Sequence, residues 1–441
     1  MELDIEEFRA PETKADLTLR QRRRAVTAAI LGNGLEFYDF VTFAFFAIQI
    51  GRTFFPSESS FLSLMGALAT FGAGFITRPL GAYLIGGYAD RHGRKPAMLF
   101  SMLLMGCGIL LLVLTPGYAA IGIAAPILAV IARLMQGLAL GGEVGSATAY
   151  MMESARDHSR GFMISWQGAS QGIAATIGAA VGLLLSHMLT GEELTSYGWR
   201  IALALGATIV PFALYIRNSL PETHEIDHKA PVEKVPLLPH LRVIVLGVAM
   251  IASGTIATYI FNYMATYGQN TLKLSEQISF AGETVNNGMS VVAILIGGAL
   301  SDRIGRRTVM VAPQIIFALT IVPCFLWLTS MRDLTSFIGA NAVLAFFSSF
   351  GWGAIYAGIS ESLPPAIRAR TFALVYSVPV ALFGGTTQMV VTWLLKVTGN
   401  PMSIAWYLTA VTLIGLVAMV LMIESAPVRK ANGLAPPVPA E

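Results

Sequence analysis

Five ionisable side chains of this sequence lie inside long apolar segments, where a charge is difficult to bury. They are Glu36, Asp39, Arg78, Arg133 and Glu143. A charge in such a water-poor setting costs several kcal/mol unless it is paired or hydrated, so these residues are candidates for function. Two arginines face three carboxylates, so the set carries one net negative charge before any proton binds. All five lie in the N-terminal half, which predicts that buried charge is confined to that half.

Asp39 and Arg133 are expected to lie at the same depth, because their segments run in opposite directions. If the first apolar segment starts at residue 25, Glu36 lies about 16 Å and Asp39 about 21 Å into it, at about 1.5 Å per residue. Arg133 reaches a similar level in a segment that starts near residue 122. An aspartate beside an arginine stays ionised, whereas a desolvated aspartate without a partner takes up a proton. The pair could therefore carry a proton, or it could be a static ion pair that fixes helix packing.

The other three charges each leave two interpretations. Glu36 is a second candidate for proton coupling or a structural group, and Glu143 could simply cap the polar loop network. Arg78 precedes Asp90 by twelve residues, which places it about 18 Å from the end of its segment at about 1.5 Å per residue. Its guanidinium is always charged and needs a carboxylate, which either the protein or a substrate could supply.

Polar side chains recur at helical spacing in three further apolar segments. A polar face on a helix in lipid must point at a cavity or at another helix. The residues concerned are Gln167 and Gln171, then Tyr259, Asn262 and Tyr263, and finally Trp352 and Tyr356. We expect them to offer hydrogen bonds to the carboxylate and hydroxyl groups of a substrate. Hydrogen bonding between helices is the alternative for each group.

The sequence offers little for enzyme chemistry. It has no metal-ligand cluster, no nucleophile elbow and no phosphate-binding loop. We therefore expect no catalytic residue, no metal and no cofactor, with a proton as the coupling ion. The net charge of +3 is too small to suggest a nucleic-acid partner.

The elements that must position these residues are membrane helices. Of the 441 residues, 55% are hydrophobic and 12% are charged, whereas soluble domains carry about 25% charged residues. With roughly 20 apolar residues per span, the chain holds about twelve transmembrane helices. The expected segments are residues 25–50, 61–88, 97–115, 120–152, 161–190, 199–217, 241–268, 283–301, 308–330, 335–360, 370–396 and 402–424. The predicted fold class is an all-α membrane protein.

A polar stretch and the distribution of basic residues predict the domains and their orientation. Residues 218–240 form a linker between bundles at 25–217 and 241–424, with tails at 1–24 and 425–441. Of the 29 lysines and arginines, five fall in the expected outer loops and two within spans, which leaves 22 in the tails and inner loops. Because cytoplasmic loops are enriched in basic residues, both termini and the linker are expected in the cytoplasm, with the protein in the cell (inner) membrane.

A repeated loop motif indicates an internal duplication. Residues 86–95 and 298–307 both fit G-x-x-x-D-R-x-G-R-[KR], and a parallel repeat of six helices is a known transporter plan. The chain is therefore expected to form two pseudo-symmetric six-helix bundles. The charged motif residues are candidate cytoplasmic gates, because their carboxylates could bind arginines or a helix N-terminus in one conformation only. They are Asp90, Arg91, Arg94, Asp302, Arg303 and Arg306. The alternative is that the loops only fix topology.

These features resemble the major facilitator superfamily over nearly the whole chain. Residues 32–40, 78–81 and 133–137 resemble its metabolite–proton symporter family, and residues 51–56 and 165–171 resemble citrate and tricarballylate carriers. Some relatives couple protons through an aspartate of the first helix paired with an arginine of the fourth, and Asp39 and Arg133 match those positions. The resemblance also implies a central site, for which Asn33, Tyr38 and Gln136 are candidates beside Arg78 and Arg133.

The resemblance implies proton-coupled uptake of a small organic acid by alternating access, with citrate or a related tri- or dicarboxylate as the best match. We expect a monomer in the lipid bilayer. A zwitterion such as betaine or proline is equally compatible with the family. A proton-coupled exporter of drugs or metabolites is less well supported, because residues 161–190 lack the proline of a Gly-Pro motif shared by drug exporters. A passive uniporter would not need Asp39 to titrate.

Overall fold

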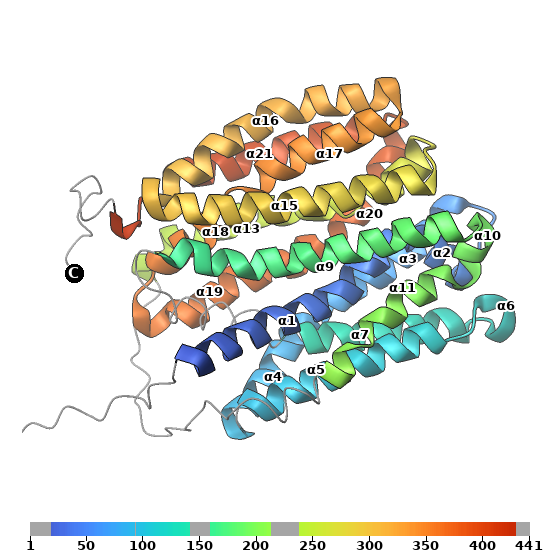
Figure 1. Ribbon diagram of the computed structural model, residues 1–441, viewed down its shortest axis with the longest axis horizontal. Helices are drawn as coiled ribbons and strands as arrows, with labels where there is room; N and C mark the ends of the chain where they lie inside the picture. Colours follow the sequence, from blue (N-terminus) through green and yellow to red (C-terminus); the bar gives the residue numbers. More distant parts are fainter. Residues whose placement is uncertain (1–18, 93, 142–158, 213–237, 429–441) are drawn as a thin grey trace, which may run out of the picture.

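The computed structural model describes residues 19–92, 94–141, 159–212 and 238–428, and every regular element in these ranges is a helix (Figure 1). The helices of the first half are α1 Leu19–Phe45, α2 Ala47–Phe54, α3 Ser60–Ile76, α4 Arg78–His92, α5 Arg94–Leu114, α6 Tyr118–Ile121, α7 Ala124–Gly141, α9 Arg160–Met188, α10 Gly191–Glu193, η2 Leu194–Gly198 and α11 Trp199–Gly206. Those of the second half are η3 Leu238–His240, α13 Leu241–Phe261, α14 Met264–Thr266, η4 Tyr267–Thr271, α15 Glu276–Ile304, α16 Arg306–Met331, α17 Leu334–Ser349, α18 Trp352–Glu361, α19 Pro365–Pro379, η5 Val380–Gly384, α20 Gly385–Thr398 and α21 Ser403–Leu421.

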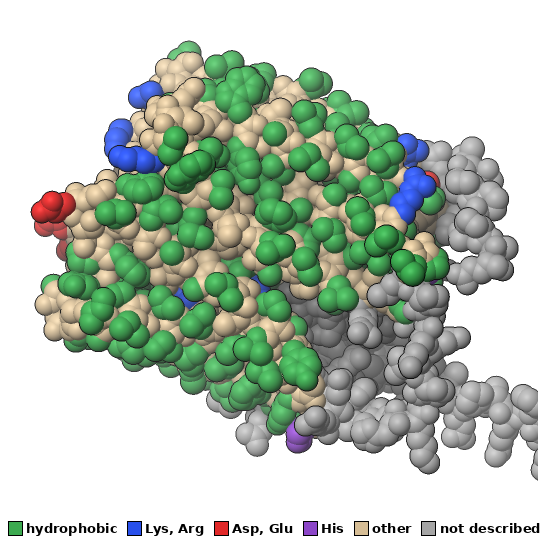
Figure 2. Space-filling view, turned by 180° about the vertical axis from the view of Figure 1, so that it is seen from behind, with side chains coloured by type: hydrophobic (Ala, Val, Ile, Leu, Met, Phe, Trp, Pro, Cys, Tyr) green, Lys and Arg blue, Asp and Glu red, His purple; other side chains and the backbone are tan. Residues whose placement is uncertain are grey.

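The described helices have the length and composition of membrane spans. Nine helical stretches are long and apolar enough to cross a bilayer, and Leu99–Leu114 is a shorter apolar helix. Each of the twelve expected segments contains a helix. Figure 2 shows a hydrophobic surface in the middle of the molecule, with most charged side chains at its two ends. This distribution matches a multi-pass membrane protein, because a charge is far less costly outside the hydrocarbon core than within it.

The two halves meet along α9 and α15, which lie side by side for most of their length (Figure 1). Small residues permit this approach. A side-chain carbon on Gly298 would lie 2.8 Å from the carbonyl oxygen of Gly161, so only glycine fits there. Close backbone contact of this kind holds helices together where lipid removes the hydrophobic driving force. We call the end of the molecule where α1 begins the terminal end, and the opposite end the far end.

Several spans are broken near the middle of the molecule. The seventh expected span is divided into α13, α14 and the π-helical turn η4, with the first break at Asn262 and Tyr263. The tenth is divided between α17 and α18. A break frees backbone hydrogen-bonding groups, which is tolerated at membrane depth only where protein or a cavity satisfies them. These breaks therefore mark the region where a site can form.

The expectation that buried charge is confined to the first half is wrong. The helix α15 begins at Glu276, seven residues before the expected start, because Ser275 caps it by accepting a hydrogen bond from the backbone N–H of Ile278. Glu283 therefore lies two turns inside a span, and it is fully buried. Hydropathy did not identify the first turns of α15 as part of a span, because neighbouring helices, rather than lipid, bury their polar side chains.

Candidate functional site

The expected ion pair in the first half is present in the structure. Nη1 of Arg133 on α7 lies 3.5 Å from Oδ2 of Asp39 on α1, and both side chains are completely buried. The same Nη1 donates to Oε1 of Gln136, one turn along α7. The approach of α7 to α3 is close, since a side-chain carbon on Gly137 would clash with the carbonyl oxygen of Gly74. This glycine contact holds Arg133 at the level of the aspartate.

Arg78 joins this pair through a shared set of phenylalanine rings. Its guanidinium carbon lies 4.5 Å from the ring centre of Phe40 and 4.1 Å from that of Phe75. The guanidinium carbon of Arg133 lies 4.7 Å from Phe40 and 4.4 Å from Phe43. A cation over an aromatic face gains about 2 kcal/mol or more when desolvated. We call Asp39, Arg78 and Arg133 the charge cluster.

The charge cluster has hydrogen-bonding capacity that the protein leaves unused. Nε and Nη2 of both arginines and Oδ1 of Asp39 are buried and make no hydrogen bond. Among the described residues, no carboxylate lies within ion-pair distance of Arg78. Buried polar atoms are nearly always bonded, so exceptions require an explanation. Four guanidinium nitrogens facing no acceptor form a suitable site for the carboxylates of an anion, because arginine binds carboxylates through two parallel hydrogen bonds.

Three of the predicted substrate-binding residues bond within the first half instead. Asn33 donates to Oγ of Ser170 at 2.7 Å and to the carbonyl oxygen of Gln167 at 3.2 Å, which ties α1 to α9. The hydroxyl of Tyr38 donates to the carbonyl oxygen of Ala202 at 2.8 Å. Gln136 accepts from Arg133, and the side chain of Gln167 is buried outside the cavity described below.

A cavity lies between the two halves, beside the charge cluster. Its empty volume is about 920 Å³, a figure that includes the open solvent at its mouth. It is lined by helices α1, α9, α13, α15, α17, α18 and α19 and by η5, and five predicted substrate-binding residues are on its wall. They are Gln171, Tyr259, Asn262, Trp352 and Tyr356.

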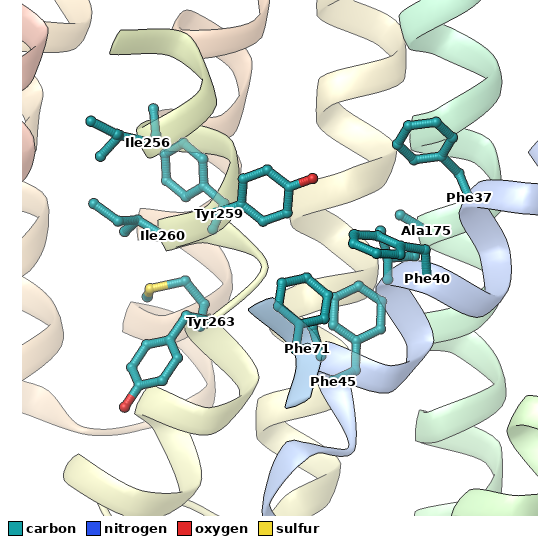
Figure 3. Close-up of a cluster of buried hydrophobic side chains, with 14 of the residues drawn as sticks. Phe37, Phe40, Phe45, Phe71, Ala175, Ile256, Tyr259, Ile260 and Tyr263 are labelled. Carbon is teal, nitrogen blue, oxygen red and sulfur yellow. The ribbon is translucent and has the colours of Figure 1, made fainter. Parts of the chain in front are cut away.

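Tyr259 connects the cavity with the charge cluster, whereas Tyr263 faces another way. The ring of Tyr259 packs on Phe71 and Phe75, and the tyrosine interacts electrostatically with both arginines. Figure 3 shows it extending from α13 towards the phenylalanines of α1. The hydroxyl of Tyr263 instead accepts a hydrogen bond from Thr392 at 3.0 Å. The break after Phe261 separates two residues that an unbroken helix would place on one face.

A second polar group lies on the cavity side and was not predicted from the sequence. Asn286, Asn287 and Ser290 line the cavity, and Glu283 lies behind the two asparagines on α15. Their numbers follow the spacing i, i+3, i+4, i+7, which is the pattern that revealed the polar face of α13. This spacing was therefore present in the sequence. It was not recognised as one polar face because the expected span began at residue 283. We call Glu283, Asn286 and Asn287 the amide cluster.

The repeated loop motif of the second half forms an ion network at the terminal end. The two carboxylate oxygens of Asp302 accept from the backbone N–H groups of Gly161 and Phe162, each at 2.9 Å. Arg306 contacts Asp302 at 2.7 Å and Glu361 at 2.8 Å, with its guanidinium fully buried. Asp302 thus joins the second half to the first turn of α9, where the helix dipole favours a negative charge.

Other predicted residues are exposed or lie outside the described side chains. Arg303 is exposed to solvent. The side chains of Glu36, Asp90, Arg91 and Arg94, and the whole of Glu143, are outside the described part of the structure. Among the described residues, no group of histidine, cysteine or acidic side chains could hold a metal ion.

Comparisons with known proteins agree with the helical fold. The family model described as Major Facilitator Superfamily matches residues 29–288 and 284–440. A citrate-proton symporter of Salmonella typhi is 37% identical over 90% of this chain and 93% of its own. A proline/betaine transporter of Salmonella typhimurium is 29% identical over 94% of this chain and 87% of its own. The crystal structure of a D-xylose-proton symporter shares the fold with a TM-score of 0.75 at 18% identity, over 92% of this chain and 99% of that one.

The helical bundles, the duplicated motif and the match of the family model over both halves lead to one conclusion. The chain belongs to the major facilitator superfamily.

Proposed function

We propose that this protein takes up citrate, or a closely related tri- or dicarboxylate, together with protons, by alternating access across the cell membrane. The observation that carries this proposal is the buried Asp39–Arg133 pair beside Arg78, which has no carboxylate partner among the described residues. The citrate-proton symporter relative supports both the coupling ion and the substrate class.

The charge cluster suggests how substrate and proton are linked. A substrate carboxylate that binds Arg78 and Arg133 competes with Asp39 for the guanidinium of Arg133. When Asp39 loses this partner, its burial favours uptake of a proton. Release of the substrate on the other side restores the pair and expels the proton. Asp39 therefore acts as the proton carrier, with Glu36 as a second candidate on the same helix.

The ion network at the terminal end supports a gate. Asp302 holds the second half to the N-terminus of α9, and Arg306 and Glu361 complete the network. Breaking these bonds is necessary for the two halves to separate at this end. We extend this role to Asp90, Arg91, Arg94 and Arg303 because of the repeated motif. The excess of basic residues in loops at this end supports a cytoplasmic location for it and for both termini.

A second candidate function is symport of a zwitterion such as betaine or proline. The rings of Trp352 and Tyr356 lie 5.2 Å apart on the cavity wall, and Tyr376 lies 6.0 Å from Tyr356. Aromatic faces of this kind bind quaternary ammonium groups, and the proline/betaine relative supports this alternative. Citrate is preferred because the four unused guanidinium nitrogens suit several carboxylates better than one.

Transport by the purified protein in proteoliposomes tests the proposal. Uptake of radiolabelled citrate is expected to rise with an inward proton gradient and to collapse when a protonophore is added. Radiolabelled betaine in matched vesicles separates the two candidate functions. Citrate uptake that ignores both the gradient and the protonophore would contradict proton symport, and gradient-driven uptake of betaine alone would replace citrate as the substrate.

A further inference from the structure

Glu283 is a buried carboxylate that the proposed transport mechanism does not use. It is 0% exposed on α15. Its Oε1 accepts from the backbone N–H of Ala265 at 3.1 Å, and its Oε2 accepts from Nδ2 of Asn287 at 3.2 Å and of Asn286 at 3.4 Å. All of these donors are neutral amides.

No cation compensates this carboxylate in the described structure. The ion pairs there involve Asp39, Asp302 and Glu361 but not Glu283. Of the helices packed on α15, α14 and α17 have no ionisable side chain, and α9 has only Arg160 at its start and the exposed His187 near its end. The helices α16 and α18 place Arg306, Arg307 and Glu361 at the terminal end, and their other titratable groups are the neutral Cys324 and Tyr356. The tyrosines nearest in the chain to Ala265 are bonded elsewhere, Tyr263 to Thr392 and Tyr267 to the carbonyl oxygen of Pro401. An ionised carboxylate at membrane depth without a counter-ion costs several kcal/mol, and a bound proton removes that cost.

The two asparagines lie between Glu283 and the cavity and connect them. Asn286 and Asn287 are on the cavity wall, yet their amide nitrogens are directed at the carboxylate behind it, and that of Asn287 also donates to the backbone carbonyl oxygen of Glu283 at 2.9 Å. Oδ1 of Asn286 is buried without a hydrogen-bond partner. An ionised carboxylate only accepts hydrogen bonds, whereas a protonated one can also donate. The state of Glu283 therefore decides whether the amides turn their N–H groups inward or offer them to the cavity.

We propose that Glu283 is a second proton-binding group of this transporter, which acts on the substrate through Asn286 and Asn287. When ionised, Glu283 holds the N–H groups of both amides away from the cavity. When protonated, it donates its new O–H to an asparagine oxygen, and the amides rotate to present N–H donors to a substrate carboxylate. The proton returns to water when the substrate leaves and the amides turn back.

The same carboxylate also links the cavity to the broken seventh span. The N–H of Ala265 is freed by the break after α13, and Glu283 satisfies it. A protonated carboxyl group is a weaker acceptor than a carboxylate, because hydrogen bonds to an ionised group are about twice as strong. Protonation therefore loosens α14 and η4 at the moment when the asparagines engage the substrate.

This inference rests on the proposed function, and the experiment counts protons directly. Citrate uptake and internal acidification are measured together in proteoliposomes for the wild type and for Glu283→Gln, which keeps the size and the neutral form of the side chain. We expect one proton fewer per citrate in the variant, with accumulation reduced but present through Asp39. Glu276→Gln, two turns earlier on α15, is the matched control and should keep the wild-type count. An unchanged count in Glu283→Gln would overturn the proposal.

A second measurement does not need citrate, so failure of the proposed function remains distinguishable from failure of this inference. The infrared carbonyl band of a protonated carboxylic acid is followed against pH in the purified protein. Part of this band should disappear in Glu283→Gln. In Asn287→Ala, which keeps Glu283 but removes a donor to its ionised form, the band should form at higher pH. A band that is unaltered in Asn287→Ala overturns the inference even if Glu283→Gln does not fold.

Discussion

The charge cluster and the amide cluster bury carboxylates in opposite ways. Asp39 is held against Arg133, whose charge is permanent, inside a cage of phenylalanines that Arg133 shares with Arg78. Glu283 is held only by neutral amides. Arginine cannot be deprotonated in proteins, so the first half keeps positive charge for an anion. The second half can change its charge at low cost.

The balance of charge follows from this difference. Among the described buried side chains of the two clusters, Arg78 and Arg133 balance Asp39 and Glu283. The sequence alone suggested a net negative set, because it counted Glu36 and Glu143, whose side chains are not described, and missed Glu283. Each proton that binds a carboxylate leaves one uncompensated positive charge. With both carboxylates protonated, the clusters match a dianion, which links the uptake of protons to the binding of an organic acid.

The largest expected effect comes from breaking the charged pair. Asp39→Asn should reduce gradient-driven accumulation of citrate more than Glu283→Gln does, while leaving citrate exchange measurable, because the proton carrier beside the arginines is lost but the arginines remain. It should also lower stability by about 3–5 kcal/mol, since Arg133 becomes a buried charge without a partner. Unfolding of the purified protein and uptake in proteoliposomes measure the two effects. Asp39→Asn combined with Arg133→Gln should recover stability but not accumulation, and full accumulation by Asp39→Asn would remove it from the mechanism.

The effect of pairing a buried charge on stability can be tested at the terminal end, where Arg306 is buried and Arg303 is exposed. Arg306→Gln should lower the free energy of unfolding by about 3–5 kcal/mol, because Asp302 and Glu361 lose their shared partner in a largely buried network. Arg303→Gln, three residues earlier and exposed, should change it by less than about 0.5 kcal/mol. Thermal unfolding in detergent measures both. Equal losses for the two variants would show that burial of Arg306 is not what makes the network strong.

Arg78 tests whether the charge cluster, rather than the amide cluster, holds the substrate carboxylates. Arg78→Lys keeps the positive charge but loses the planar fork. A hydrogen bond to a charged group contributes about 1.5–3 kcal/mol, so half-maximal citrate uptake should require roughly 10–100 times more citrate. Arg52→Lys, exposed at the far end, is the control and should not change this concentration. If Arg78→Lys also leaves the half-maximal citrate concentration unchanged, the substrate carboxylates do not bind Arg78.

The twelve helical segments and the meeting of Asp39 with Arg133 could be predicted, because both depend on regular properties of the chain. Apolar length defines a span, and the rise per residue of a helix places two side chains at one depth. The phenylalanine cage could not be predicted in this way. Phe40, Phe71 and Phe75 come from α1 and α3, and their position over the arginines depends on how the helices pack.

The position of Tyr263 and the burial of Glu283 were not predicted from the sequence, because the first depends on irregular backbone and the second on uneven burial. Tyr263 was expected to share the polar face of Tyr259, but the break at Asn262 turns it towards Thr392. Glu283 escaped because the first turns of α15 are polar and are covered by protein. Hydropathy reports the surroundings of a helix only where lipid is its neighbour, so a span inside the bundle can begin earlier than its apolar run.

The smallest expected effect concerns Tyr259, which lies between the charge cluster and the cavity. Tyr259→Phe removes a hydroxyl at the junction of the arginines and the cavity. A neutral hydrogen bond contributes about 0.5–1.5 kcal/mol, so citrate affinity should fall roughly 2–10-fold.

Tyr263→Phe is the matched control on the same span. It removes one of the two acceptors of the Thr392 hydroxyl, the other being the carbonyl oxygen of Gln388, and should lower stability by at most about 1.5 kcal/mol without changing affinity. Radiolabelled citrate uptake over a range of concentrations measures the first effect, and thermal unfolding the second. If both variants lose affinity equally, the break in span seven does not separate a binding tyrosine from a packing one, and Tyr259 does not connect the charge cluster with the cavity.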